Sequence, residues 1–371
     1  MEAPIIQFYK RTPKSYEIAC MMFENCNLRC KFCFEPHVNK RIDLDYIMTI
    51  PNIIKENFSK EYEKFPTIQK VYLMMWGGEV FYDALPDSVF ETYYKFVDAV
   101  RDIFQKNFPN VNVIFSWLSN GVFTNYERVE KLVRYSNGII NFSYDPVNRF
   151  SSPKQKETMV NSATYFSDKM GDKISITLTK DSIKGFIEND KELIKFNNMG
   201  YNIDVNYYIA NINWKELLPS DDEIFSFYKW ALDNRLFNMK VLEKMLSYYT
   251  DEKVSHYCDC KFCSQITYGE WSTDCAKCSS ILPSKMFYHQ YDDIITEDNS
   301  NEIKATMGLI KRGCLGCQYY NNCQKFCWIA IVFQGAKMGI CPYIQSFKYI
   351  EENPQILEDF IRWKNDYKAR G

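Results

Sequence analysis

The sequence predicts an α/β protein: a partial (β/α)6 TIM-like barrel, followed by a small cysteine-rich domain and a C-terminal helix. Short apolar segments alternate six times with helical patterns in the first two thirds of the chain. These six units take roughly 220 residues, whereas a complete eight-fold barrel takes about 250. Cysteines are almost confined to the two ends of the chain. Repeated β–α units imply parallel strands joined by right-handed crossovers.

The strands are predicted from short apolar runs that are rich in β-branched and aromatic residues or have a turn signal nearby. They are expected near residues 16–23, 68–76, 111–118, 138–145, 173–179 and 202–209. A doubly wound sheet would satisfy the same pattern, but the length fits a partial barrel. In both folds the chemistry lies at the carboxyl ends of the strands, so motifs directly after them carry the most weight.

The helices are predicted from apolar residues that recur at helical spacing. They are expected near residues 43–60, 88–107, 126–136, 154–170, 183–198 and 221–234. Pro86, Pro153 and Ser220 stand where helices should begin, and Gly200 follows one that ends. A further helix is expected near 239–250 and a last one around 354–369. We therefore divide the chain into a barrel (1–236), a linking helix (237–256), a cysteine-rich domain (257–347) and a C-terminal helix (348–371).

Composition and charge exclude several classes of protein. Hydrophobic residues make up 46% and charged residues 25% of the 371, as in an ordinary globular protein. The net charge is −2, which argues against broad electrostatic binding of nucleic acid. No run approaches the roughly 20 apolar residues of a membrane span, and the start has no signal-peptide pattern. We expect a cytoplasmic protein that does not enter the membrane.

The fourteen cysteines form two local clusters. Cys20, Cys26, Cys30 and Cys33 lie near the start, and the other ten fall between Cys258 and Cys341. Disulfides rarely persist in a reducing cytosol, and a disulfide scaffold would spread its bridges over the fold. The clustering therefore points to metal. Cys20 lies within the first predicted strand and is expected to be a buried small hydrophobe.

The first cluster follows the first strand as a C-x3-C-x2-C loop of Cys26, Cys30 and Cys33. Three thiolates can hold three irons of a [4Fe–4S] cluster, which normally takes four cysteines, and this leaves one iron open for an outside ligand. The alternative is a zinc site with a distant fourth ligand.

This motif, with an aromatic residue before its last cysteine, resembles the radical S-adenosylmethionine (SAM) superfamily. The resemblance implies that Cys26, Cys30 and Cys33 bind the cluster and that Phe32 lies near the adenine of SAM. In that family the amino and carboxylate groups of SAM chelate the open iron. The reduced cluster cleaves the sulfonium to a 5′-deoxyadenosyl radical, which abstracts hydrogen from the substrate.

Two further strand ends resemble motifs of the family. Gly77-Gly78-Glu79, after the second strand, is similar to its GGE motif, whose backbone meets the amino group of SAM. Two glycines let a chain approach a ligand closely, and a carboxylate can bind an ammonium group. The alternative is that Gly77-Gly78 only forms the turn between the strand and the next helix. After the third strand, Ser119-Asn120-Gly121 is similar to the TNG segment, whose polar groups would reach the ribose or carboxylate of SAM.

Four polar residues on the next two strands are candidates for the same pocket. Ser143 and Asp145 end the fourth strand, and Thr177 and Thr179 belong to the fifth. A hydrogen bond within a turn or at a strand end explains each of them equally well.

The second cluster resembles the SPASM extension of radical SAM enzymes, with its C-x2-C-x5-C-x3-C…C signature. The residues that match are Cys314, Cys317, Cys323, Cys327 and Cys341. The extension usually holds two auxiliary [4Fe–4S] clusters. The resemblance implies that Cys327 crosses to the first of these and that the other four bind the second.

The upstream ligands of the first auxiliary cluster are less defined. Our assignment is Cys258, Cys263 and either Cys275 or Cys278, with Cys260 left over. The spacing after Gly269 is five residues where the family has four. A zinc site that uses His256 with Cys258, Cys260 and Cys263 is an alternative. Asp274 is a candidate general base, or a solvated loop residue.

The resemblance covers nearly the whole chain and includes sulfatase-maturating and peptide-maturase enzymes. We expect a radical SAM oxidoreductase that oxidises or crosslinks a peptide or protein side chain, with a reducing partner such as flavodoxin or ferredoxin. The first alternative is a radical SAM dehydrogenase or epimerase acting on a small sugar, alcohol or amino compound. The second is a zinc-stabilised binding protein, which explains the cysteines but not the β–α repeats.

Overall fold

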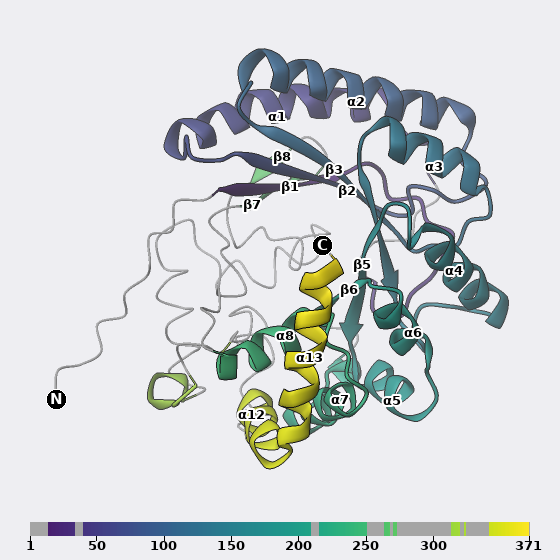
Figure 1. Cartoon of the computed structure of the whole chain (residues 1–371). Coiled ribbons are helices and arrows are strands. Elements are labelled where there is room, and N and C mark those ends of the chain that lie inside the picture. The colour runs from purple at the N-terminus through teal and green to yellow at the C-terminus, as the bar shows by residue number, and fades with distance from the viewer. Residues whose placement is uncertain are drawn as a thin grey trace.

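The computed structural model describes residues 14–33, 40–208, 215–250, 263–267, 270–272, 313–319, 323 and 341–370. Within these ranges the six expected strands are present and pair in sequence order, each parallel to the next. They are β1 (Ser15–Met21), β2 (Lys70–Trp76), β3 (Asn112–Ser119), β4 (Ile139–Tyr144), β5 (Gly171–Leu178) and β6 (Asn202–Tyr207). The sheet curves into an open half-barrel (Figure 1), so the predicted fold class is confirmed.

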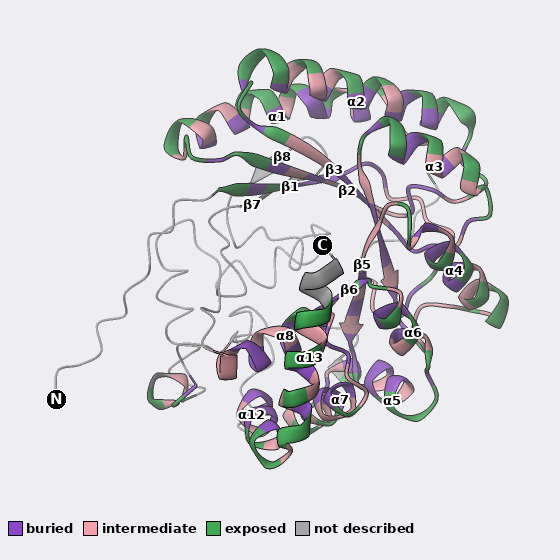
Figure 2. Cartoon of the chain, in the orientation of Figure 1, coloured by how far each residue is buried: buried purple, intermediate pink, exposed green. Residues whose placement is uncertain are grey.

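Helices cover the outer face of this sheet and bury one stripe each against it (Figures 1 and 2). The long ones are α1 (Leu44–Lys64), α2 (Asp87–Asn107), α3 (Tyr126–Tyr135), α4 (Pro153–Phe166) and α7 (Asp221–Asp233). Side chains at their starts satisfy the free backbone N–H groups: Ser220 accepts from the N–H of Glu223, and Asn125 accepts from that of Arg128. Local sequence signals therefore set where these helices begin.

The helix expected at 183–198 is two helices, α5 (Lys180–Glu188) and α6 (Glu192–Asn198). The break is at Asp190, whose buried carboxylate accepts from the backbone N–H groups of Glu192 (3.1 Å) and Leu193 (3.3 Å). The same carboxylate accepts from Lys156 Nζ at 2.6 Å and from the hydroxyl of Tyr144. Asp190 therefore starts a new helix and ties it to α4 and β4.

The cysteine-rich region extends the sheet, which the sequence did not predict. β7 (Cys263–Thr267) pairs in parallel with β1, and β8 (Glu270–Ser272) pairs antiparallel with β7. The register sets Cys263 opposite Glu17, near the start of β1. This hairpin covers the edge of β1, which would otherwise present unpaired backbone groups.

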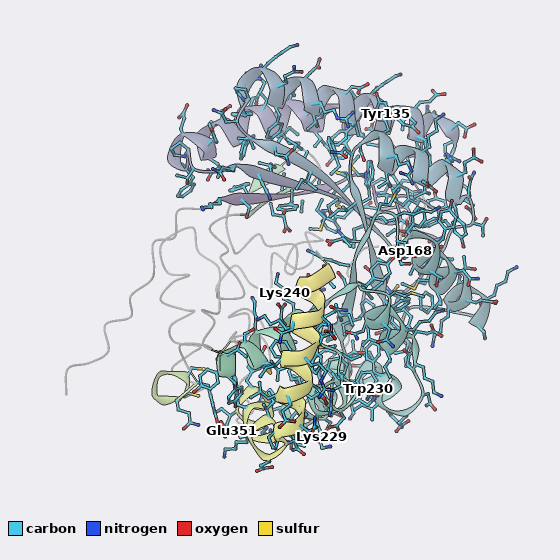
Figure 3. The ribbon with its side chains drawn as sticks, viewed as in Figure 1. Tyr135, Asp168, Lys229, Trp230, Lys240 and Glu351 are labelled. Atoms are coloured by element: carbon cyan, nitrogen blue, oxygen red, sulfur yellow. The ribbon has the colours of Figure 1, made fainter. Side chains whose placement is uncertain are left out.

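The C-terminal residues form two helices, α12 (Pro342–Glu352) and α13 (Pro354–Arg370), which lie near α7 and α8 (Lys240–Ser247) (Figure 1). Pro354 separates them because proline cannot continue a helix from the preceding turn. Arg235, just after α7, binds Asp359 of α13 at 2.8 Å, and the hydroxyl of Tyr349 donates to Asp233 at 2.6 Å. Figure 3 shows this region with Lys229 of α7 labelled, whose ammonium lies 4.6 Å from the ring centre of Tyr349.

The expected last helix is confirmed as α13, whereas α12 was not predicted; the domain boundaries themselves stay a prediction. Within the described part of the chain, none of the helices combines the length and the apolarity that crossing a bilayer takes.

Candidate functional site: the carboxyl ends of β1 to β5

The loop that carries Cys26, Cys30 and Cys33 leaves β1 while still bonded to the end of β2. The N–H of Met22 donates to the carbonyl of Trp76, and the N–H of Gly78 donates to that of Phe23, both at 2.8 Å. A Cβ on Gly78 would lie 1.9 Å from the carbonyl oxygen of Asn25. The glycines of the GGE-like motif therefore allow the cysteine loop itself to pack closely.

The three cysteines are partly or fully buried: Cys30 is buried, and Cys26 and Cys33 are half-buried. Burial raises the pKa of the Cys26 thiol to about 11 and raises that of Cys30 as well. Both thiols therefore stay protonated at neutral pH as long as no cation lies nearby. A metal ion that binds a thiol offsets the loss of solvation and deprotonates it.

The three thiols fit an iron–sulfur cluster by donor chemistry and placement. They lie on one loop, at the strand end where parallel barrels place their chemistry. Among the described residues, no three cysteine, histidine or carboxylate side chains are already arranged around a point for one metal ion.

The segment after β4 packs over the cysteine loop. The N–H of Lys31 donates to the carbonyl of Asn148 at 3.0 Å, and the thiol of Cys30 faces the carbonyl of Arg149 at 3.9 Å. The Arg149 guanidinium lies 5.3 Å from the ring centre of Phe32. Neither Asn148 nor Arg149 was predicted; their position directly after a strand end is the only signal in the sequence.

This segment contains buried polar atoms without a hydrogen-bond partner: Asp145 Oδ2, Asn148 Oδ1 and Arg149 Nε. Asp145 is fully buried, and its other oxygen accepts from the N–H groups of Val147 (2.8 Å) and Asn148 (2.5 Å). Burial raises the pKa of Asp145. Since buried polar groups are normally paired, these atoms fit a bound ligand that offers both hydrogen-bond donors and an acceptor. SAM carries hydroxyl, amino and carboxylate groups that meet this requirement.

Glu79 does not face an open site. Its residue is 1% exposed; Oε1 accepts from the Ser119 hydroxyl (2.7 Å) and the N–H of Phe81 (2.9 Å), and Oε2 accepts from the N–H of Asn120 (2.5 Å). Burial raises the pKa of Glu79 to about 7, against the lowering effect of these bonds. The carboxylate therefore joins the ends of β2 and β3.

Ser119 and Asn120 are likewise engaged by the protein. The Ser119 oxygen also accepts from the N–H of Gly121 at 3.0 Å. The side-chain amide of Asn120 contacts Asn27, Val122 and Cys26. The Asn120 side chain thus joins the cysteine loop to the segment after β3, and the contact of Ser119 and Asn120 with SAM stays a prediction.

Ser143 and Thr177 lie on the same face of neighbouring strands as Asp145, since side chains alternate along a strand and Ser143 pairs with Ser175. Both are half-buried. Thr179, by contrast, caps α5 by accepting from the N–H of Ser182 at 3.0 Å. The structure thus gives Thr179 a hydrogen bond at the start of a helix, which was the second of the two interpretations above.

The structure describes part of the second cysteine cluster. Cys314 begins a short 3-10 turn (η5, Cys314–Gly316), and Cys341 immediately precedes α12. Between Cys317 and Cys323, the buried Tyr319 stacks on Phe347 of α12 with ring centres 4.3 Å apart. This stacking docks the turn on the helix that follows Cys341. Outside the described residues lie His256, Cys258, Cys260, Asp274, Cys275, Cys278 and Cys327.

Comparison of the sequence with known protein families gives no match, and comparison with curated proteins gives none either. Comparison of the structure with solved structures does. Nearly the whole chain is similar to the structure of native anSMEcpe with bound AdoMet and Cp18Cys peptide, with a TM-score of 0.62, 14% sequence identity, and coverage of 94% of this chain and 99% of that chain.

A second structure, native anSMEcpe with bound AdoMet, gives a TM-score of 0.60 at 13% identity, over 93% of this chain and 99% of that chain. Streptococcus suis SuiB gives a TM-score of 0.46 at 15% identity, over 86% of this chain and 74% of that chain. At the level of the fold, the resemblance that the motifs predicted is confirmed.

Proposed function

We propose that this protein is a radical SAM enzyme. The observation that carries the proposal is the convergence, at one edge of a half-barrel, of the C-x3-C-x2-C loop with a β4 segment whose buried polar atoms lack partners. Cys26, Cys30 and Cys33 would hold a [4Fe–4S] cluster. When bound and reduced, this cluster would supply the one electron that splits SAM into methionine and a 5′-deoxyadenosyl radical, which takes a hydrogen atom from the substrate. A flavodoxin- or ferredoxin-like partner would deliver the electron.

The protein's own residues would bind and orient SAM. Asp145 Oδ2 would accept from ribose hydroxyls, and Asn148 Oδ1 offers a second acceptor next to it. Phe32, braced by Arg149, would pack against the adenine. Ser143 and Thr177 face the same side of the sheet and would extend this polar lining. Glu79, Ser119 and Asn120 would hold the cysteine loop against the ends of β2 and β3.

The second cysteine cluster would hold two auxiliary [4Fe–4S] clusters. Their proposed ligands are Cys258, Cys263, Cys275 or Cys278, Cys314, Cys317, Cys323, Cys327 and Cys341. Such clusters, with all irons held by protein, would carry electrons or position the substrate. Asp274 would be the general base. We propose a peptide or protein side chain as substrate. The anSMEcpe structure, to which this chain is similar over nearly its whole length, contains a bound Cp18Cys peptide, and this supports the proposal.

Reductive cleavage of SAM tests the proposal. Anaerobically reconstituted and reduced protein should release 5′-deoxyadenosine, and Cys26→Ala, Cys30→Ala and Cys33→Ala should each abolish the release. Cys20→Ala is the matched control, because Cys20 is buried within β1 and away from the loop; it should cleave SAM as the wild type does. Unchanged cleavage in any of the three loop variants would refute the assignment. Deuterium transfer from labelled candidate peptides into 5′-deoxyadenosine then tests the substrate class.

A further inference from the structure

The side-chain amide of Asn120 has every hydrogen-bonding group in use. Its Nδ2 donates to Asn27 Oδ1 at 2.8 Å and to Cys26 Sγ at 3.8 Å, and its Oδ1 accepts from the N–H of Val122 at 2.8 Å. The residue is 5% exposed. Exchanging the amide oxygen and nitrogen would set two donors against each other at Val122, so the N–H groups must point towards Asn27 and Cys26.

Asn120 is held in this orientation from two sides. Its backbone N–H donates to Glu79 Oε2 at 2.5 Å, and the Asn27 amide donates to the carbonyl of Val122 at 2.8 Å. Asn27 immediately follows Cys26, so the two asparagines bridge the cysteine loop and the segment after β3. The donor that faces the sulfur therefore cannot turn away without breaking the hydrogen bonds of the amide to Asn27 and Val122.

Hydrogen bonds to the sulfurs are one of the means by which a protein sets the reduction potential of an iron–sulfur cluster. An N–H dipole directed at a thiolate stabilises the more negative, reduced state. Cys26 Sγ accepts from the backbone N–H of Leu28 (3.4 Å) as well as from Asn120. The first donor belongs to the loop, whereas the second comes from a strand end 94 residues away.

From this geometry we infer that Asn120 is a positioning residue that raises the reduction potential of the cluster bound by Cys26, and so eases the electron transfer that SAM cleavage requires. The inference rests on the proposed function, since it needs the cluster. Asn120 would donate a hydrogen bond to the sulfur of Cys26, and Glu79 and Asn27 would hold Asn120 in the orientation that this bond needs.

An EPR redox titration of the intact, reconstituted protein tests the inference, following the signal that changes when SAM is added. In Asn120→Ser the serine oxygen can still accept from the N–H of Val122, but no donor reaches Cys26. We expect the equilibrium constant for one-electron reduction to fall about three- to tenfold, tenfold being about 59 mV. The auxiliary clusters should titrate as in the wild type. Asn25→Ser is the matched control, because the Asn25 amide donates to the carbonyl of Lys40 and not to sulfur; its potential should not change.

The outcomes separate this inference from the proposed function. If Cys26→Ala leaves the SAM-sensitive signal in place, the proposed function fails. If that signal depends on Cys26 but Asn120→Ser titrates with the wild type, only the role of Asn120 is refuted. Should Asn120→Ser lose the cluster, Asn120→Thr keeps an acceptor for Val122, removes the donor and adds no charge; a lowered potential there supports the inference. Loss of the cluster from both variants would overturn it, since the side chain would then serve assembly.

Discussion

Glu79 and Asn120, which follow the neighbouring strands β2 and β3, are joined by a 2.5 Å hydrogen bond from the backbone N–H of Asn120 to Glu79 Oε2. The bond is buried and spans 41 residues of sequence. Through it, the GGE-like and TNG-like motifs form one unit against which the cysteine loop packs. A carboxylate that would suit a ligand's ammonium is thus used to fix the protein's own backbone.

Glu79→Gln should destabilise the barrel and change its pH dependence. The NH2 group of the glutamine would face the N–H and O–H donors that now bind Glu79. This lowers the free energy of unfolding by about 1–3 kcal/mol. The folded-state pKa of Glu79, about 7, lies above its ordinary value of 4.5. Its contribution to stability is therefore fully present below about pH 4.5, is lost as the pH rises to about 7, and then stays level.

Urea unfolding of the wild type and of Glu79→Gln from pH 4.5 to 8 checks this. The difference between their free energies of unfolding should narrow with rising pH up to about 7. A difference that does not narrow over the same range would show that Glu79 is ionised throughout.

Gly78→Val should displace the cysteine loop, because the new Cβ would overlap the backbone of Asn25. We expect most of the iron bound by this loop to be lost, measured as iron content after reconstitution. Gly200→Asn is the control: a Cβ there meets nothing within 4 Å, and asparagine tolerates its positive φ of 89°. Full iron content with weaker SAM binding in Gly78→Val would mean instead that the glycine makes room for the ligand.

Asp145→Asn should weaken SAM binding about tenfold or more while it retains the cluster spectrum. The asparagine oxygen can keep the bonds to Val147 and Asn148, but the buried acceptor Oδ2 becomes a donor. Equilibrium binding of SAM to the reconstituted protein measures the change. Asp172→Asn, at the opposite end of the strands, should bind SAM as the wild type does. Equal affinity in the two variants would remove Asp145 from the SAM site.

Iron content tests the auxiliary clusters. The whole protein should hold about twelve irons, and the triple Cys26/Cys30/Cys33→Ala variant about eight. Retention of about four irons and one zinc would favour the zinc alternative for Cys258–Cys278. Retention of none would show that the second cysteine cluster is not an iron–sulfur domain.

Much of the barrel could be predicted from sequence because its signals are local. Apolar periodicity and capping residues located the strands and most helices to within a few residues, and the three motifs followed strand ends as expected. The break at Asp190 was missed because it depends on where that carboxylate finds buried partners from α4 and β4. β7 was missed because its pairing with β1 joins residues 246 positions apart, such as Glu17 and Cys263.

The site shows the same division. Cysteine spacing identified the ligand candidates, because it places three thiols on one short loop, where they can bind the same cluster. The roles of Glu79 and Asn120 could not be read from their motifs, since each depends on a partner from another strand end. Asn27, Asn148 and Arg149 carry no pattern of their own and become site residues only when the segments after β1, β3 and β4 meet.

We propose that SAM binds the open iron of a cluster held by Cys26, Cys30 and Cys33. The most direct measurement is electron–nuclear double resonance of the reduced protein with SAM labelled by 15N on its amino group and 17O on its carboxylate. We predict hyperfine coupling from both labels in the wild type and in Cys20→Ala, and none in the triple loop variant. A cluster signal that shows no coupling to either label, with SAM at saturating concentration, would contradict the claim.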